Sequence, residues 1–300
     1  MRCLPLAALP LAALGLVSGA QALRLPSAPA CPIFPPDNPW NRRVDHLPVL
    51  PNSAALVAAI GADEDVDTRF GPSPADGIPI NVIRGAATPK YHARFEYAVQ
   101  SDRGPYPIPP NVAIESGDDG HAIIVARDSC RLYELYGLRR EGPGWRAGSG
   151  AIWNLRSNRL RPRGWTSADA AGLPILPGLA RWDEVARGRI DHALRITVPR
   201  TRNAFVYPAR HHASGSSDPK LPAMGQRFRL RAGFDASGFP PQARVFVAAM
   251  KRYGVIVADH GSPWSLNGIP NPHWDNNDHN ALDRIKGSDF EAVDARSLHP

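Results

Sequence analysis

Cysteine is scarce in this sequence, with three residues in a chain of 300. Cys3 lies in an N-terminal apolar stretch, which leaves Cys31 and Cys130 for the rest of the protein. An even pair in an exported chain predicts one disulfide, because oxidising compartments favour the bonded form. Two unrelated buried thiols are the alternative. If both sulfurs are bonded, neither cysteine is a catalytic nucleophile.

Long apolar runs are also lacking, except for Leu4 to Val17. Arg2 before this run and small residues up to Ala22 after it are typical of a secretory signal, which we predict to cover residues 1–22. The run is short for a bilayer span, which needs about 20 apolar residues, so a membrane anchor is the weaker alternative. We therefore expect a secreted or periplasmic protein without membrane insertion.

The motifs of several large enzyme classes are missing. The sequence has no P-loop, no Gly-rich dinucleotide turn, no His-Glu-x-x-His and no Gly-x-Ser-x-Gly. Although the formal net charge is +7, and +6 once Arg2 is removed (7 − 1), the arginines are dispersed and form no nucleic-acid-binding arm. We expect no cofactor, no metal, no nucleic-acid partner and a monomer. The positive charge still favours an anionic partner.

The chain shows one change of composition, at its start. Residues 23–39 are rich in proline, which predicts an extended segment on the surface. Residues 40–300 contain no linker and no repeat, so we expect a single globular domain. Two helices are predicted, at Asn52 to Ala62 and at Pro241 to Tyr253, where apolar residues recur at helical spacing and a glycine follows.

Short runs of β-branched and aromatic residues dominate the rest of the chain. Proline and glycine clusters separate them, and Asp128-Ser129 between two of them predicts a hairpin. So many short strands predict a mainly β fold, a sandwich or jelly-roll with a few peripheral helices; an α+β domain is the alternative. The predicted strands are Ile78 to Ile83, Ala93 to Val99, His121 to Ala126, Leu132 to Tyr136, Trp145 to Leu155, His192 to Val198, Ala204 to Tyr207, Arg227 to Arg231 and Val255 to Ala258.

Glu134 is the first candidate for chemistry. Strand alternation places it on the same face as Leu132 and Tyr136, among apolar and aromatic neighbours. Such surroundings disfavour the charged form and raise the pKa of a carboxyl, as a general acid requires. The alternative is a solvent-facing glutamate on an edge strand or one paired with an arginine.

Asp169 and Asp259 are further candidate acids. Asp169 lies in an apolar loop that is bounded by glycine and proline, where it serves catalysis or the N-terminus of a short helix. Asp259 directly follows the strand Val255 to Ala258, which would hold it rigidly. The Asp/Asn run after His273 offers oxygen ligands for calcium but lacks EF-hand spacing, so a capped turn is expected there.

Three basic residues complete the candidate site. His192 heads the apolar face of its predicted strand, and Arg195 points to the opposite face. His211 belongs to the cluster Arg210-His211-His212 on a loop. His192 is a candidate proton acceptor or a core histidine. Arg195 and His211 are candidates for binding an anion or a sugar carboxylate, and the alternative for His211 is a solvated turn.

Tryptophans at loops or strand ends are frequent, and their rings stack on the apolar faces of sugars. We expect Trp153, Trp165 and Trp264 to bind substrate, while others of this group belong to the core. The whole group is Trp40, Trp153, Trp165, Trp264 and Trp274.

Three strings resemble those of a family of secreted bacterial single-domain proteins of unassigned function. They are Asp-Asn-Pro-Trp-Asn at 37–41, Gly-Trp-Thr-Ser-Ala-Asp-Ala-Ala-Gly-Leu-Pro at 164–174 and Lys-Gly-Ser-Asp-Phe-Glu at 286–291. The resemblance extends over the whole mature chain. It implies export and one domain, and it implies no particular activity.

These observations predict a secreted enzyme that cleaves a polysaccharide or cell-wall glycan by carboxylate general acid/base chemistry. Glu134 and Asp169 are the predicted pair, and Asp259 is a substitute for either. One alternative is a lyase on an acidic glycan, in which Arg195 or His211 neutralises a carboxylate and His192 takes the proton. The other is a non-catalytic carbohydrate or cell-wall binding protein.

Overall fold

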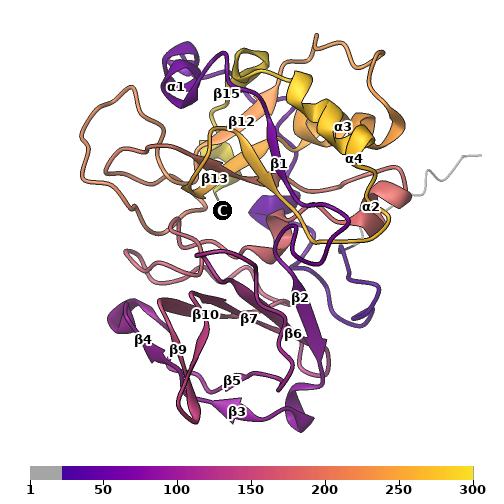
Figure 1. Ribbon diagram of the computed structural model, residues 1–300. Coiled ribbons are helices and arrows are strands. Elements are labelled where there is room, and N and C mark those ends of the chain that lie inside the picture. The colour runs from indigo at the N-terminus through magenta and orange to yellow at the C-terminus, as the bar shows by residue number, and fades with distance from the viewer. Residues whose placement is uncertain (1–21, 300) are drawn as a thin grey trace, which may run out of the picture.

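The computed structural model describes residues 22–299, so the predicted signal at residues 1–22 lies outside the described part except for its last residue. Over this range the chain forms fifteen strands and four short α-helices, joined by loops and 3₁₀ turns (Figure 1). The strands form several mixed sheets and no closed barrel. The prediction of a mainly β fold with a few helices is therefore confirmed.

The larger sheet has six strands in the order β1-β14-β11-β13-β12-β15 and occupies one half of the molecule (Figure 1). β1 pairs with β14 and β11 with β13 in parallel, and the other neighbours are antiparallel. The strands are β1 (Asp67–Arg69), β11 (Leu194–Val198), β12 (Arg227–Leu230), β13 (Val255–His260), β14 (Ser265–Asn267) and β15 (Phe290–Ala292).

The helices accompany this six-stranded sheet. α1 (Ser53–Ile60) packs against β15, and α3 (Pro241–Arg252) packs against β12 and against α4 (Asn276–Asn280). α2 (Trp182–Ala186) also contacts α3. Both predicted helices are thus present, with ends that differ from the prediction by one or two residues. Among residues 22–299, no helix combines the length and the apolar character that crossing a bilayer requires.

The second half is built on a four-stranded sheet in the order β10-β7-β6-β2 (Figure 1). β6 and β7 form the predicted antiparallel hairpin. Alternate residues of β6 enter two separate apolar clusters, because both faces of this sheet are covered. The strands are β2 (Ile80–Ile83), β6 (Ala122–Ala126), β7 (Arg131–Tyr136) and β10 (Ser149–Asn154).

Two small sheets complete this half: a three-stranded sheet β4-β9-β8 and the pair β3-β5. The single strand predicted at Trp145 to Leu155 was wrong, because it breaks at Gly148 into two strands. A side chain at Gly148 would meet the Tyr136 ring at 2.5 Å. The strands are β3 (Lys90–Tyr91), β4 (Arg94–Phe95), β5 (Tyr106–Pro107), β8 (Arg139–Glu141) and β9 (Gly144–Ala147).

Two further strand predictions were wrong in extent. The segment Ala204 to Tyr207 forms only one isolated bridge, between Phe205 and Met224. The segment Ala93 to Val99 contributes only the two residues of β4 and then turns into a 3₁₀ helix, Ala98–Gln100. This turn brings residues 97 and 100 to the cavity described below.

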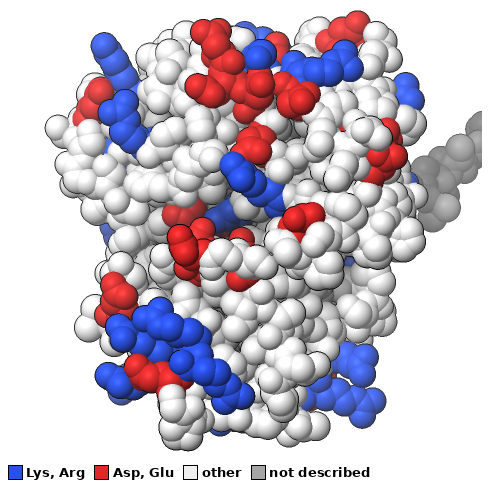
Figure 2. All heavy atoms as spheres, viewed as in Figure 1, with Lys and Arg blue, Asp and Glu red and all other residues white. Residues whose placement is uncertain are grey.

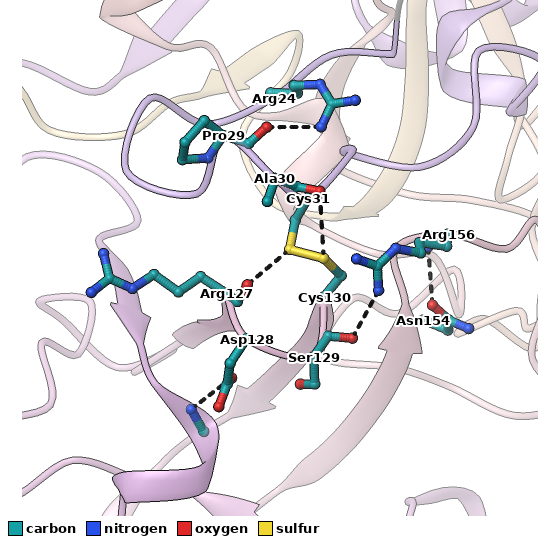
Figure 3. Close-up of a disulfide and its surroundings, with 11 residues drawn as sticks. Arg24, Pro29, Ala30, Cys31, Arg127, Asp128, Ser129, Cys130, Asn154 and Arg156 are labelled. Atoms are coloured by element: carbon teal, nitrogen blue, oxygen red, sulfur yellow. Dashed lines mark hydrogen bonds between the residues drawn. A yellow bond between two sulfur atoms is a disulfide. The ribbon is translucent and has the colours of Figure 1, made fainter.

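The predicted disulfide between Cys31 and Cys130 is present (Figure 3). It joins residues 99 apart in sequence and ties the proline-rich segment to the hairpin of β6 and β7. This segment is not extended on the surface as predicted. It folds through several turns and buries Leu25, Ile33 and Phe34 in the same apolar cluster as the disulfide.

Candidate functional site

A cavity of about 390 Å³ lies between the two main sheets. Its walls include Tyr136 and Ser149 from β7 and β10 of the four-stranded sheet. The six-stranded sheet contributes Arg195 and Thr197 from β11, Asp259 and His260 from β13, and Asn267 from β14. A pocket of this size at a boundary between two sheets is typical of a ligand site.

One wall of the cavity is a loop at residues 166–172, the apolar loop of Asp169 in which a short helix was one of the two expectations. The structure has turns here without a helix. Ser149 Oγ donates to Ser167 O at 2.6 Å, which fixes the loop to β10. Gly172 has a φ of +68°, and a side chain there would meet Trp165 O at 2.4 Å. The loop therefore needs glycine at its end, and it presents residues 168–170 to the cavity.

Asp169 is fully buried and paired with Arg195. Arg195 Nε lies 3.0 and 2.8 Å from the two carboxylate oxygens, and Nη2 also donates to Oδ1. Burial opposes the charge of Arg195, but Asp169 outweighs it and raises the pKa of the guanidinium. Arg195 Nη1 donates to Asn267 Oδ1. The two side chains thus hold each other in place, and Arg195 is also bonded to Asn267.

Asp259 is one of the carboxyls that line the cavity, and a quarter of its side chain is exposed. Its Oδ2 accepts from Ala170 N at 3.0 Å, and its Oδ1 accepts from His260 N at 2.7 Å. Burial, together with the charge of Asp169, raises the pKa of Asp259 to about 7, although Arg195 and the two N–H groups act in the opposite direction. At neutral pH this group can therefore donate or accept a proton.

His211 stands beside the same backbone residue. Its Nδ1 donates to Ala170 O at 2.7 Å, since a carbonyl can only accept. When the ring is neutral, Nε2 therefore carries the lone pair. Burial lowers the pKa of His211, so the neutral form prevails at neutral pH. Ala170 thus holds a candidate acid through its N–H and a candidate base through its carbonyl.

His121, at the start of β6, lines the cavity on the side of the four-stranded sheet. Nε2 donates to Ala168 O at 3.1 Å, and Nδ1 donates to Glu115 Oε2. Burial opposes the imidazolium, but the hydrogen bond and charge of Glu115 outweigh it and raise the pKa of His121. Both ring nitrogens are thus engaged, which fixes His121 in the cavity wall, and Glu115 favours its charged form.

A metal could be held by Glu115, Asp119 and His121, whose ligand atoms lie within 4.8 Å of one another. His121 already donates through both nitrogens in this structure, so an ion would have to displace its contact with Glu115. Of the described residues these three form the metal-ligand set, and the prediction of no metal stays a prediction.

Glu134, the first sequence candidate, does not line the cavity. It is fully buried in β7 and accepts from Ile175 N at 3.0 Å, Leu176 N at 2.9 Å and Trp153 Nε1 at 3.2 Å. Burial raises the pKa of Glu134 to about 7, despite these three donors. The predicted pKa shift is present, but the carboxyl caps a buried 3₁₀ turn (Leu176–Gly178) and has no solvent-facing edge.

His192 also lies away from the cavity. Nε2 is 2.9 Å from Glu184 Oε2 and Nδ1 is 2.8 Å from Ala193 O, and the ring is fully buried. This geometry corresponds to the core histidine that the sequence left open as the alternative. The predicted group Glu134, Asp169, His192 and Asp259 therefore does not meet at one groove, since only the two aspartates line it.

The three tryptophans predicted to bind substrate do not line this cavity either. Trp264 is buried in the core of the six-stranded half, where its Nε1 donates to Gly61 O at 2.8 Å. Trp153 and Trp165 border a separate hollow beside Arg161. Both rings lie within 5.6 Å of the Arg161 guanidinium. Only Arg195 and His211 of the predicted binding residues belong to the cavity.

Sequence reasoning missed the contribution of the four-stranded half. His121 was included in a predicted strand but was not recognised as a site residue, because its partner Glu115 precedes it in a loop without a motif. Tyr136 was treated only as a neighbour of Glu134. The sequence does place a polar residue, His121, at the first position of an apolar strand, and this position could have identified it as a candidate site residue.

A search of protein-family models, curated proteins and solved structures finds no match to this chain. The resemblance to a family of secreted proteins therefore stays a prediction.

Proposed function

We propose that this protein is a secreted or periplasmic enzyme that cleaves a glycan by general acid/base chemistry, with Asp259 and His211 as the pair. The observation that carries the proposal is the Asp259 carboxyl, which faces a polar cavity with a pKa of about 7. The Cys31–Cys130 disulfide is compatible with an oxidising compartment.

The two groups have complementary protonation states. Protonated Asp259 would donate its proton to the glycosidic oxygen of the leaving group, while neutral His211 would take a proton from the attacking water at Nε2. Asp169 and Arg195 are positioning residues in this scheme. Their charges lie beside Asp259 and tune its pKa, and the two side chains are bonded to each other.

The lining of the cavity favours a substrate with many hydroxyl groups. Amide and hydroxyl side chains from both halves line it, together with Tyr97 and Tyr136. The serine and threonine hydroxyls donate to backbone carbonyls, which leaves their oxygens as acceptors for sugar hydroxyls. The polar members are Gln100, Ser149, Thr166, Ser167, Thr197 and Asn267.

The two alternative functions receive less support. A binding-only protein needs stacking platforms, and no tryptophan of residues 22–299 lines the cavity. The lyase scheme needs Arg195 or His211 to meet a substrate carboxylate and His192 to take a proton. Arg195 is already paired with Asp169 and bonded to Asn267, and His192 is fully buried away from the cavity. Hydrolysis uses only groups that face the cavity.

The test is a screen for reducing sugars and unsaturated products over neutral and acidic polysaccharides. We expect reducing ends without unsaturation. Asp259→Asn and His211→Gln should each lower turnover by about 10²–10⁴-fold, the usual contribution of a positioned acid or base. Asp63→Asn, at an exposed position, is the matched control and should keep full activity. Full activity of Asp259→Asn, or no cleavage of any glycan, would contradict the proposal.

A further inference from the structure

Three arginines form one row across the small sheet β4-β9-β8. In register, Arg146 of β9 is paired with Arg94 of β4 on one side and with Arg139 of β8 on the other. All three are exposed or partly exposed, with 79% of the Arg94 side chain and 40% of the Arg146 side chain accessible. Figure 2 shows blue side chains gathered where Figure 1 places β4 and β9. We call these residues the arginine row.

The arginine row carries an excess of positive charge. Like charges in direct register across neighbouring strands repel each other and destabilise a sheet. Glu141 is the one carboxylate among residues 22–299 that pairs with the row, at 3.0 Å from Arg94 and 3.9 Å from Arg146. Arg139 forms no ion pair with any described residue, and Glu96 on the adjoining segment pairs with none of the three. The row and Glu141 together therefore carry a net charge of +2 (3 − 1).

The arginine row is linked to the cavity along all three strands. Tyr97 follows Arg94 by three residues, Ser149 follows Arg146 by three residues, and Tyr136 precedes Arg139 by three residues. All three linked residues line the cavity.

The three chain segments stay side by side between the row and the cavity. Gly148 N donates to Tyr136 O at 2.7 Å, and Tyr97 N donates to Gly148 O at 2.9 Å. Three residues of extended chain span about 10 Å, so the row lies within about two sugar rings of the cavity edge.

We propose that the arginine row binds an acidic polysaccharide, whose chain extends from the cavity across the sheet while one linkage is held at Asp259. A polyuronic acid carries one carboxylate on each ring, and arginine binds carboxylates through its planar fork. Neighbouring strands lie about 4.8 Å apart, so a glycan that leaves the cavity along the strands meets three closely spaced positive charges where it crosses the row. This inference rests on the proposed function, and it names the substrate class.

An acidic glycan fits this surface better than a nucleic acid. The row lies on a short three-stranded sheet, with no helix beside it among the described residues to enter a groove. Trp145, the tryptophan of this sheet, is buried and covered by Arg140, whose guanidinium carbon lies 4.1 Å from the ring centre. It therefore offers no face on which a base could stack. The row continues instead into a cavity lined by hydroxyl and amide groups.

The experiment measures binding of polygalacturonate to the full mature chain by calorimetry at low salt, with dextran as the neutral probe and duplex DNA as the competing polyanion. The variant Arg94→Gln/Arg139→Gln/Arg146→Gln should bind polygalacturonate about 10- to 100-fold more weakly. The control Arg187→Gln/Arg189→Gln/Arg252→Gln removes the same charge from the other half and should bind like the wild type.

Glu141→Gln gives a change of opposite sign and guards against a misfolded triple variant. It removes the carboxylate from the row and should tighten binding several-fold. Unchanged affinity in both the triple variant and Glu141→Gln would overturn the inference. So would equal weakening by the control variant, or tighter binding of DNA than of polygalacturonate.

Failure of the row and failure of the proposed function give different results. If the wild type binds polygalacturonate through the arginine row but cleaves no glycan, the binding surface is supported and the proposed enzymatic function is contradicted. If cleavage requires Asp259 but the triple variant cleaves polygalacturonate as well as the wild type does, the proposed enzymatic function is supported. The role of the arginine row is then contradicted.

Discussion

Glu134→Gln separates a structural carboxyl from a catalytic one. The wild-type carboxyl accepts three N–H groups, from Ile175, Leu176 and Trp153. In the variant an amide NH₂ replaces one oxygen and faces a donor, most directly Trp153 Nε1. Two buried donors then lack an acceptor, at about 1–3 kcal/mol each, so we expect a loss of about 2–6 kcal/mol. For a chain of this size, that corresponds to a drop in Tm of roughly 5–15 °C.

The pH dependence of this loss has a definite sign. The folded protein raises the pKa of Glu134 from 4.5 to about 7. A carboxyl with a raised pKa stabilises the fold fully below the unfolded value, and this contribution is lost as pH rises to 7. The shift of 2.5 units (7 − 4.5) corresponds to at most about 3 kcal/mol. Because glutamine does not titrate, the deficit of the variant should be largest near pH 5 and smaller at pH 8.

The assay is thermal melting at both pH values, with glycan cleavage measured on the same samples and Glu64→Gln as an exposed control. We expect lowered stability and retained activity per folded molecule. A variant with an unchanged Tm and lost activity would place Glu134 in the reaction. A deficit that grows with pH would refute the raised pKa.

Three further changes test other parts of the structure. Asp259→Asn should be more stable than the wild type at pH 8 in urea unfolding. The gain is up to about 4 kcal/mol, because the fold raises the pKa of the Asp259 carboxyl from 3.8 to about 7, and it should vanish below about pH 4. Arg195→Met leaves the buried Asp169 carboxylate without its partner and should cost about 3–5 kcal/mol in the same assay; a neutral effect would contradict the pairing. Replacing Cys31 and Cys130 together by alanine opens a loop of 99 residues and should cost about 4–5 kcal/mol, whereas equal stability would show that the bond does not constrain the unfolded chain.

Local features of the fold could be predicted because local chemistry dictates them. The hairpin of β6 and β7 follows from two apolar runs joined at Asp128-Ser129, and Asp128 accepts from Gly85 N and Ala86 N in the structure. The helix at α3 follows from its apolar spacing. The break at Gly148 could not be predicted, because its cause is the Tyr136 ring on a neighbouring strand.

Half of the site could be predicted, for a comparable reason. Asp169, Arg195, His211 and Asp259 were singled out by their own segments, and the fold brings them together. Burial of Glu134 was also expected, but a sequence does not say whether a buried carboxyl meets a cavity or backbone N–H groups. The predicted role of the tryptophans in substrate binding failed for the same reason, because a tryptophan in a loop, such as Trp264, can still be buried in the core.

The most direct test of the central claim is the pKa of the Asp259 carboxyl, measured by ¹³C NMR titration of the aspartate Cγ signals, with Asp259→Asn used to assign the resonance. This measurement needs no substrate. Burial beside Asp169 predicts a midpoint of about 7. A midpoint near 4, the ordinary value of an exposed aspartate, would contradict the account of Asp259 as the acid of the cavity.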